Sequence, residues 1–228
     1  MTTSRMFPFI TAKLNALGGK CPHACDYCYA QGPKGLVKTY RMVKYEGEIR
    51  LILLELKKKF KDFDVVFVVD MADLFAAAVP SEIITAILEN IISRKEAATY
   101  FFLTKNPARY KEFLPLLRKI NCILGITLET NRSTSFCSHA PSPMERWEAF
   151  RDLEFPNKFV SIEPIMAFDT KELLEIIFNI SNLDAVAVGY DNHGANLPEP
   201  ALAQVQGLIR ELEKNYKVYV KTLREAWA

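Results

Sequence analysis

Short apolar runs alternate with amphipathic stretches along almost the whole chain. The apolar runs are rich in β-branched and aromatic residues and predict buried strands at residues 7–14, 65–69, 99–103, 123–128, 159–162, 185–188 and 218–220. Between them, apolar residues recur at helical spacing and predict helices at residues 41–60, 83–92, 107–117, 142–153, 169–180 and 200–214.

Several predicted helices carry capping signals. Asn106 precedes a proline at the first helical position, and Ser142 with Glu145 forms a capping-box pattern. Asp169 is expected to cap the helix that follows it, and Pro115 is expected to kink its helix.

The strand-helix alternation predicts parallel βαβ units in a single sheet, and therefore an α/β fold. Six or seven such units are fewer than the eight of a full barrel, and the chain of 228 residues is shorter than the ~250 residues typical of one. We therefore expect a TIM-like partial barrel, with a doubly wound open sheet as the alternative. No linker is visible, so residues 1–228 are expected to form one domain.

Composition adds only weak limits on function. Half of the residues are hydrophobic, which predicts a globular protein, and the net charge of +2 neither favours nor excludes a nucleic-acid partner. The lysine-rich run 57–61 is interpreted as a solvated helix end. No apolar run approaches the ~20 residues of a membrane helix and no signal region is seen. We therefore predict a cytoplasmic protein that is not associated with a membrane.

Three of the five cysteines, Cys21, Cys25 and Cys28, lie close together after the first predicted strand. Such thiolates can converge on one soft metal centre, either zinc or an iron-sulfur cluster. Three ligands leave one metal position open, as a catalytic metal requires, unless His23 joins them. His23 is interpreted as a loop residue, Cys122 as an inert core residue, and the participation of Cys137 and His139 is left open.

Polar residues follow most of the predicted strands. In parallel α/β folds the carboxyl ends of the strands surround the functional site, so these residues are its candidates. They are Asp70, Asp73, Thr104, Lys105, Glu129, Arg132, Glu163, Tyr190, Asp191, Asn192 and Lys221. Glu163 and then Glu129 stand out, because a carboxylate against a buried strand needs a partner that offsets its desolvation.

The cysteine spacing, with Tyr27 just before the third cysteine, resembles the signature of the radical S-adenosylmethionine (SAM) superfamily. The segments 68–75, 102–110, 125–132 and 160–164 resemble a phage-associated three-cysteine branch and, more distantly, the spore photoproduct lyase group. The resemblance covers nearly the whole chain and implies a radical SAM core fold.

This resemblance implies a [4Fe-4S] cluster held by Cys21, Cys25 and Cys28, with its fourth iron binding SAM. An external electron donor of the flavodoxin or ferredoxin type would reduce the cluster, and the resulting 5′-deoxyadenosyl radical would abstract hydrogen from the substrate. The implied roles are adenine packing by Tyr27, SAM binding near Asp70, Asp73 and Thr104, ribose or substrate contacts by Glu129 and Glu163, and anion binding by Lys105, Arg132 and Lys221. Glu129, Glu163, Lys105 and Lys221 are the catalytic candidates, and the glycines that usually accompany the acidic motif are missing here.

Two other interpretations stay open at this point. The three cysteines with His23 could hold a structural zinc ion, or the chain could bind a cluster without radical chemistry. The open side of a partial barrel suits a large substrate, such as a nucleic acid or a protein, but the sequence does not identify it.

Overall fold

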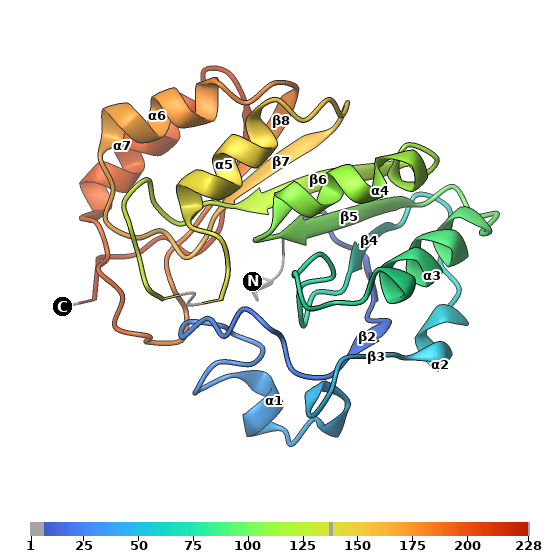
Figure 1. Ribbon diagram of the computed structural model, residues 1–228. Helices are drawn as coiled ribbons and strands as arrows, with labels where there is room; N and C mark the ends of the chain where they lie inside the picture. Colours follow the sequence, from blue (N-terminus) through green and yellow to red (C-terminus); the bar gives the residue numbers. More distant parts are fainter. Residues whose placement is uncertain (1–6, 137–138, 228) are drawn as a thin grey trace.

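A computed structural model of the chain describes residues 7–136 and 139–227. Its centre is a sheet of seven parallel strands in the order β1-β4-β5-β6-β7-β8-β9 (Figure 1). These strands are β1 (Ala12–Leu14), β4 (Val65–Val68), β5 (Thr99–Thr104), β6 (Cys122–Thr127), β7 (Lys158–Ile162), β8 (Leu183–Val188) and β9 (Lys217–Val220). β1 and β9 form the two edges and do not pair, so the predicted open barrel is confirmed.

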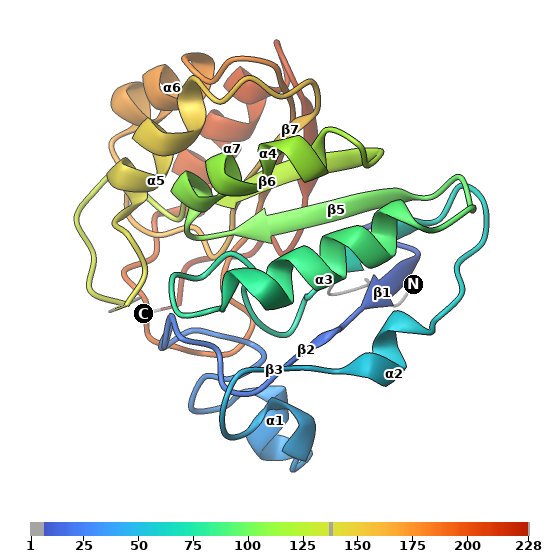
Figure 2. The same ribbon diagram turned by 45° about the vertical axis from the view of Figure 1, so that its right-hand side comes forward.

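Helices cover the outer face of this sheet (Figure 2). They are α3 (Ser81–Ile92), α4 (Tyr110–Leu117) after the 3₁₀ turn η2 (Pro107–Arg109), α5 (Pro143–Arg151), α6 (Thr170–Phe178) and α7 (Leu202–Leu212). The capping box of Ser142 and Glu145 is confirmed. Asp169 makes no side-chain capping bond, because its carboxylate binds Arg132 instead. Within the described ranges, no helix is long and apolar enough to cross a membrane.

Aromatic side chains fill the inner face of the sheet. Phe101 makes edge-to-face contacts with Phe67 and Phe159 at centroid distances of 5.0 and 5.1 Å. Phe7 and Phe9 pack onto the same cluster from the start of the described chain. The predicted first strand is therefore too long, since residues 7–10 form a turn inside the barrel and β1 begins only at Ala12.

The predicted helix over residues 41–60 is wrong. This region contains η1 (Val43–Tyr45), β3 (Arg50–Leu51) and the single-turn helix α2 (Leu53–Leu56), and α1 (Leu36–Thr39) precedes it. Gly47 has a φ of +71°, which is incompatible with a continuous helix. Tertiary hydrogen bonds replace helical ones, because β3 pairs with β2 (Leu17–Gly18), the N–H of Gly19 donates to Lys44 O, and the N–H of Ile52 donates to Ala16 O.

Lys158 lies fully buried at the start of β7, beneath the end of α5. Its ammonium donates to the carbonyl oxygens of Phe150, Arg151 and Leu153 at 2.7 to 3.1 Å. These carbonyls stand at the carboxyl end of the helix, where backbone acceptors lack intrahelical donors. The lysine therefore serves as an internal cap for α5.

We expect Lys158→Met to lower the free energy of unfolding by about 2–4 kcal/mol, because several buried acceptors lose their donor. Urea unfolding followed by circular dichroism measures this change. Lys171→Met on α6 is the control, since that side chain is 91% exposed and its removal should change stability by less than about 0.5 kcal/mol. Equal effects of the two substitutions would contradict the capping role of Lys158.

Candidate functional site

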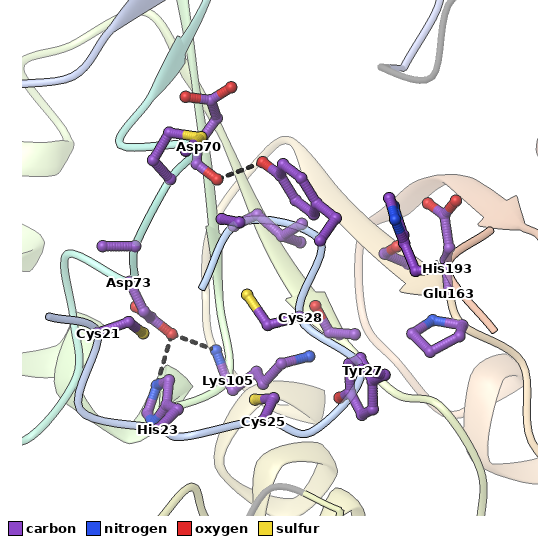
Figure 3. A pocket seen from close by; sticks show the side chains of 18 of the residues that line it. Cys21, His23, Cys25, Tyr27, Cys28, Asp70, Asp73, Lys105, Glu163 and His193 are labelled. Atoms are coloured by element: carbon purple, nitrogen blue, oxygen red, sulfur yellow. Dashed lines mark hydrogen bonds and ion pairs between the residues drawn. The ribbon is translucent and has the colours of Figure 1, made fainter. Parts of the chain in front are cut away.

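A cavity of about 460 Å³ opens at the carboxyl ends of the strands. Most of the residues predicted for the site line it together, with the cysteine loop on one side and the strand ends on the other (Figure 3). They are Cys21, Cys25, Tyr27, Cys28, Asp70, Asp73, Thr104, Lys105, Glu163, Asp191, Asn192, Tyr190 and Lys221. The aromatic cluster on the inner face of the sheet forms the floor of this cavity, here called the aromatic floor, and reaches it through Phe7 and Phe67.

The three clustered cysteines are free thiols, with Cys25 buried and the other two half-buried. Gln31 stabilises this loop through two hydrogen bonds. Its side-chain Oε1 accepts from the backbone N–H of Cys21 at 2.6 Å, and its backbone N–H donates to Cys28 Sγ at 3.3 Å. Burial and the nearby negative charge of Asp73 raise the pKa of the Cys21 thiol to about 12. This thiol is therefore neutral at pH 7 unless a cation lies beside it.

His23, between the first two cysteines, ties the loop to the end of β4. Its Nε2 lies 2.8 Å from Asp73 Oδ2, and both side chains are buried. Asp73 also accepts from the hydroxyl of Thr104 and from the N–H of Lys105. Burial opposes ionisation of Asp73, but the hydrogen bond and charge of His23, with these other donors, lower its pKa. Asp73 is therefore an ionised anchor for the cysteine loop.

Tyr27, between the second and third cysteines, makes the second anchor. Its hydroxyl donates to Glu129, which also binds Lys105 Nζ at 2.6 Å and Arg146 at 2.7 Å. Burial opposes ionisation of Glu129, but the charges of Lys105 and Arg146 lower its pKa to about 2. Sequence reasoning missed Arg146, although an arginine on the buried face of α5, between Pro143 and Phe150, was a usable signal.

Asp70 connects β1 to the cysteine loop. Its carboxylate binds Asn15 Nδ2 at 2.6 Å and Lys13 Nζ at 2.7 Å, and its carbonyl accepts from the hydroxyl of Tyr29. Val69, just before it, has a φ of +61°, an unusual conformation for a β-branched residue. The sharp bend turns the chain directly after β4 and brings Asp70 to the cavity wall.

Glu163 and Lys221 form an ion pair of 2.6 Å on the other side of the cavity. Burial raises the pKa of Glu163 even though Lys221 and Lys105 oppose this shift, and Asp191 adds to it. Lys221 Nζ also lies 4.5 Å from the ring centroid of Phe7, on the aromatic floor. Glu163 directly follows β7 and Lys221 directly follows β9, and β8 separates these two strands in the sheet.

Two predicted site residues do not line the cavity. Glu129 lies behind the cavity wall with its carboxylate occupied by three donors, and Arg132 forms an exposed ion pair with Asp169 at 2.8 Å. His139 Nδ1 lies 3.0 Å from Pro22 O, beside the cysteine loop. Cys137 falls outside the described residues.

The donor types on this loop suit a soft metal centre. Three thiols line one cavity, and thiolates are the usual ligands of iron-sulfur clusters. Across residues 7–136 and 139–227, no group of three or more histidine, cysteine, aspartate or glutamate side chains is arranged to hold a metal ion.

The fold is similar to that of solved structures. It matches spore photoproduct lyase structures, including a double mutant with bound AdoMet and dinucleoside spore photoproduct, at a TM-score of 0.64 and 11% identity over 98% of this chain and 79% of that one. A tyrosine-to-phenylalanine mutant of the same lyase gives 0.60 and 12%, over 98% and 79% of the two chains. The chain therefore has the fold of spore photoproduct lyase.

The family follows from the sequence itself. Residues 9–197 match the family described as a protein of unknown function (DUF5131), so the chain belongs to this family. No curated protein sequence matches the chain. The narrower resemblance to a phage-associated branch stays a prediction.

Proposed function

We propose that this protein is a radical SAM enzyme. The observation that carries the proposal is the convergence of Cys21, Cys25 and Cys28 on one cavity at the carboxyl ends of an open parallel barrel. The fold match to a lyase with bound AdoMet supports it. A [4Fe-4S] cluster on these cysteines would supply the electron that cleaves SAM to methionine and a 5′-deoxyadenosyl radical.

The residues between the cysteines would fix the geometry of the loop. His23 and Tyr27 point to buried carboxylates, Asp73 and Glu129, so the loop is held at two places before any cofactor binds. Such preorganisation keeps the three thiols in position and leaves the cavity side of the loop for SAM. Glu129 thus acts as an anchor in this proposal, instead of contacting the ribose.

The remaining cavity residues are proposed to contact SAM or substrate. Tyr27 would offer its ring to the adenine, and Asp70 and Thr104, which line the cavity, would bind the SAM amino group. Glu163 and Lys221 offer an acceptor and a donor for the ribose or the substrate. Lys105 is committed to Glu129, and Arg132 lies away from the cavity, so neither is the main anion-binding group.

The substrate is proposed to be a macromolecule, nucleic acid or protein, that enters through the open side of the barrel. An external donor of the flavodoxin or ferredoxin type would provide the electron. The aromatic floor of the cavity, which Phe7 and Phe67 form, would exclude water from the radical chemistry.

Anaerobic reconstitution with iron and sulfide, followed by dithionite and SAM, tests this function. We expect charge-transfer absorption from a cluster and release of 5′-deoxyadenosine, measured by chromatography. Tight binding of one zinc ion in place of a cluster would identify a structural metal protein. A cluster that yields no 5′-deoxyadenosine would identify a scaffold without radical chemistry, and either result would reject the proposal.

A further inference from the structure

One short segment beside the cavity carries four basic residues, as the lysine-rich run 57–61 does elsewhere in the chain. Residues 34–44, here called the basic segment, contain Lys34, Lys38, Arg41 and Lys44 and no acidic residue. The rest of the chain has 25 basic and 27 acidic residues, so without this segment the protein would carry a charge of −2. The near-neutral total therefore includes a locally basic segment, in which Lys44 is paired with Glu55 at 2.6 Å and the other three cations lie on its exposed side.

The basic segment is firmly attached to the cysteine loop. The N–H groups of Leu36 and Val37 donate to the carbonyls of Tyr29 and Ala30 at 2.9 Å, and Leu36 lines the cavity. Val37 packs with Tyr45, Ala30 and Met71 in a small buried cluster. The segment thus projects from the edge of the site as a fixed structure (Figure 1).

Its exposed side chains include both basic and apolar groups. Lys38 and Arg41 are exposed, and neither forms an ion pair with any residue that the structure describes. Tyr40, between them, is 70% exposed, and Val43 is exposed to the same extent. Exposed aromatic rings between unpaired cations are typical of surfaces that bind single-stranded nucleic acids, where bases stack and phosphates pair with the cations.

We propose that the basic segment binds the backbone of a single-stranded nucleic acid, with Tyr40 stacked on a base, and so presents a nucleotide to the cavity. This inference rests on the proposed function, since it names the substrate class of that site. A protein partner fits less well, because a stable protein interface takes about 20–30 residues a side whereas this projection is much smaller. Enzymes that act on a base need that base outside the duplex, either in a single strand or flipped out. A reactive site inside a barrel has the same need, because a stacked base in a duplex cannot enter it.

The chain contains a matched control for charge. Lys57 and Lys59 are also exposed lysines, but they precede β4 and therefore lie toward the amino ends of the strands, opposite the cavity. Lys38→Glu with Arg41→Glu and Lys57→Glu with Lys59→Glu change the net charge equally. Any difference in binding between the two double variants therefore depends on where the charges lie and not on how many are changed.

The experiment is fluorescence anisotropy of the reconstituted protein with a labelled single-stranded DNA oligonucleotide of mixed sequence, and with its RNA equivalent, over a range of salt concentrations. We expect Lys38→Glu with Arg41→Glu to weaken binding at least about tenfold and to reduce the slope of log K against log salt by about 1.4, as for two lost phosphate contacts. Tyr40→Ala should weaken binding about tenfold without changing this slope. The Lys57 and Lys59 variant should bind like the unmodified protein.

Absence of oligonucleotide binding, or equal losses in the two charge variants, would overturn the proposal. Unchanged oligonucleotide binding with slower reduction by flavodoxin would assign the surface to an acidic electron donor instead and would also overturn it. SAM cleavage measured without oligonucleotide tests the enzymatic function separately from the proposed binding surface. Tyr40→Ala should leave this cleavage unchanged, because Tyr40 is proposed to contact only the oligonucleotide. Loss of SAM cleavage in the unmodified protein would reject the enzymatic function alone.

Discussion

Cys25→Ala should yield a folded protein that retains no [4Fe-4S] cluster and forms no detectable 5′-deoxyadenosine. Cys25 is the central and most buried of the three loop cysteines, and a cluster with only two protein ligands is not held. Iron and sulfide analysis, absorption spectroscopy and electron paramagnetic resonance of the reduced protein measure the loss.

Cys122→Ala is the matched control for this experiment. Cys122 is also buried, but it lies at the start of β6, at the opposite end of the sheet from the cavity. It should keep the cluster and the activity, with a loss of stability of about 1 kcal/mol from the small cavity. An intact cluster in Cys25→Ala, or loss of the cluster in Cys122→Ala, would show that the ligands are assigned wrongly.

Glu129→Ala should lower the free energy of unfolding by about 3–5 kcal/mol, because it leaves Arg146 buried without its carboxylate. It should also weaken cluster retention, since Tyr27 loses its acceptor. Asp169→Ala removes a carboxylate from an ion pair that is half exposed on both sides and should cost at most about 1 kcal/mol. Urea unfolding of the two variants under the same conditions compares the pairs.

The same carboxylate predicts a dependence of stability on pH. The folded pKa of Glu129 is about 2, below its ordinary value of 4.5, so the stabilisation is fully present above pH 4.5 and is lost as the pH falls toward 2. The size of this loss is about 3 kcal/mol. Glu129→Gln should therefore show a flatter decline of stability over this range, and identical declines would mean that Glu129 is not ionised in the folded protein.

The sequence predicted the sheet well because most of its strands are uniform apolar runs. β4 through β9 appear within a few residues of the predicted runs, and the helices between them follow the expected order. The failure at residues 41–60 has a physical cause, since the chain turns at Gly47 and its short elements make tertiary hydrogen bonds in place of helical ones. Tyr45 is buried as the spacing predicted, but Leu53 is 65% exposed, so the apolar spacing did not determine the backbone path here.

The site was predicted less completely than the sheet. The strand-end rule placed Asp70, Lys105, Glu163 and Lys221 near the cysteines, and the structure brings them to one cavity. The same rule could not distinguish Glu129, which points to Arg146 behind the wall. Such partners come from distant helices, so the direction of a side chain at a strand end depends on tertiary contacts that spacing does not record.

The aromatic floor has a consequence for the order of folding. Phe9 lies 4.8 Å from Tyr219 between ring centroids, so the beginning of the described chain packs against its last strand. Contacts between such distant parts of a sequence form late and slow the folding of a domain. During synthesis, the cavity can be completed only after β9, which carries Tyr219, and Lys221 directly after it have emerged from the ribosome. The cysteine loop is therefore synthesised well before the β9 side of its cavity can form.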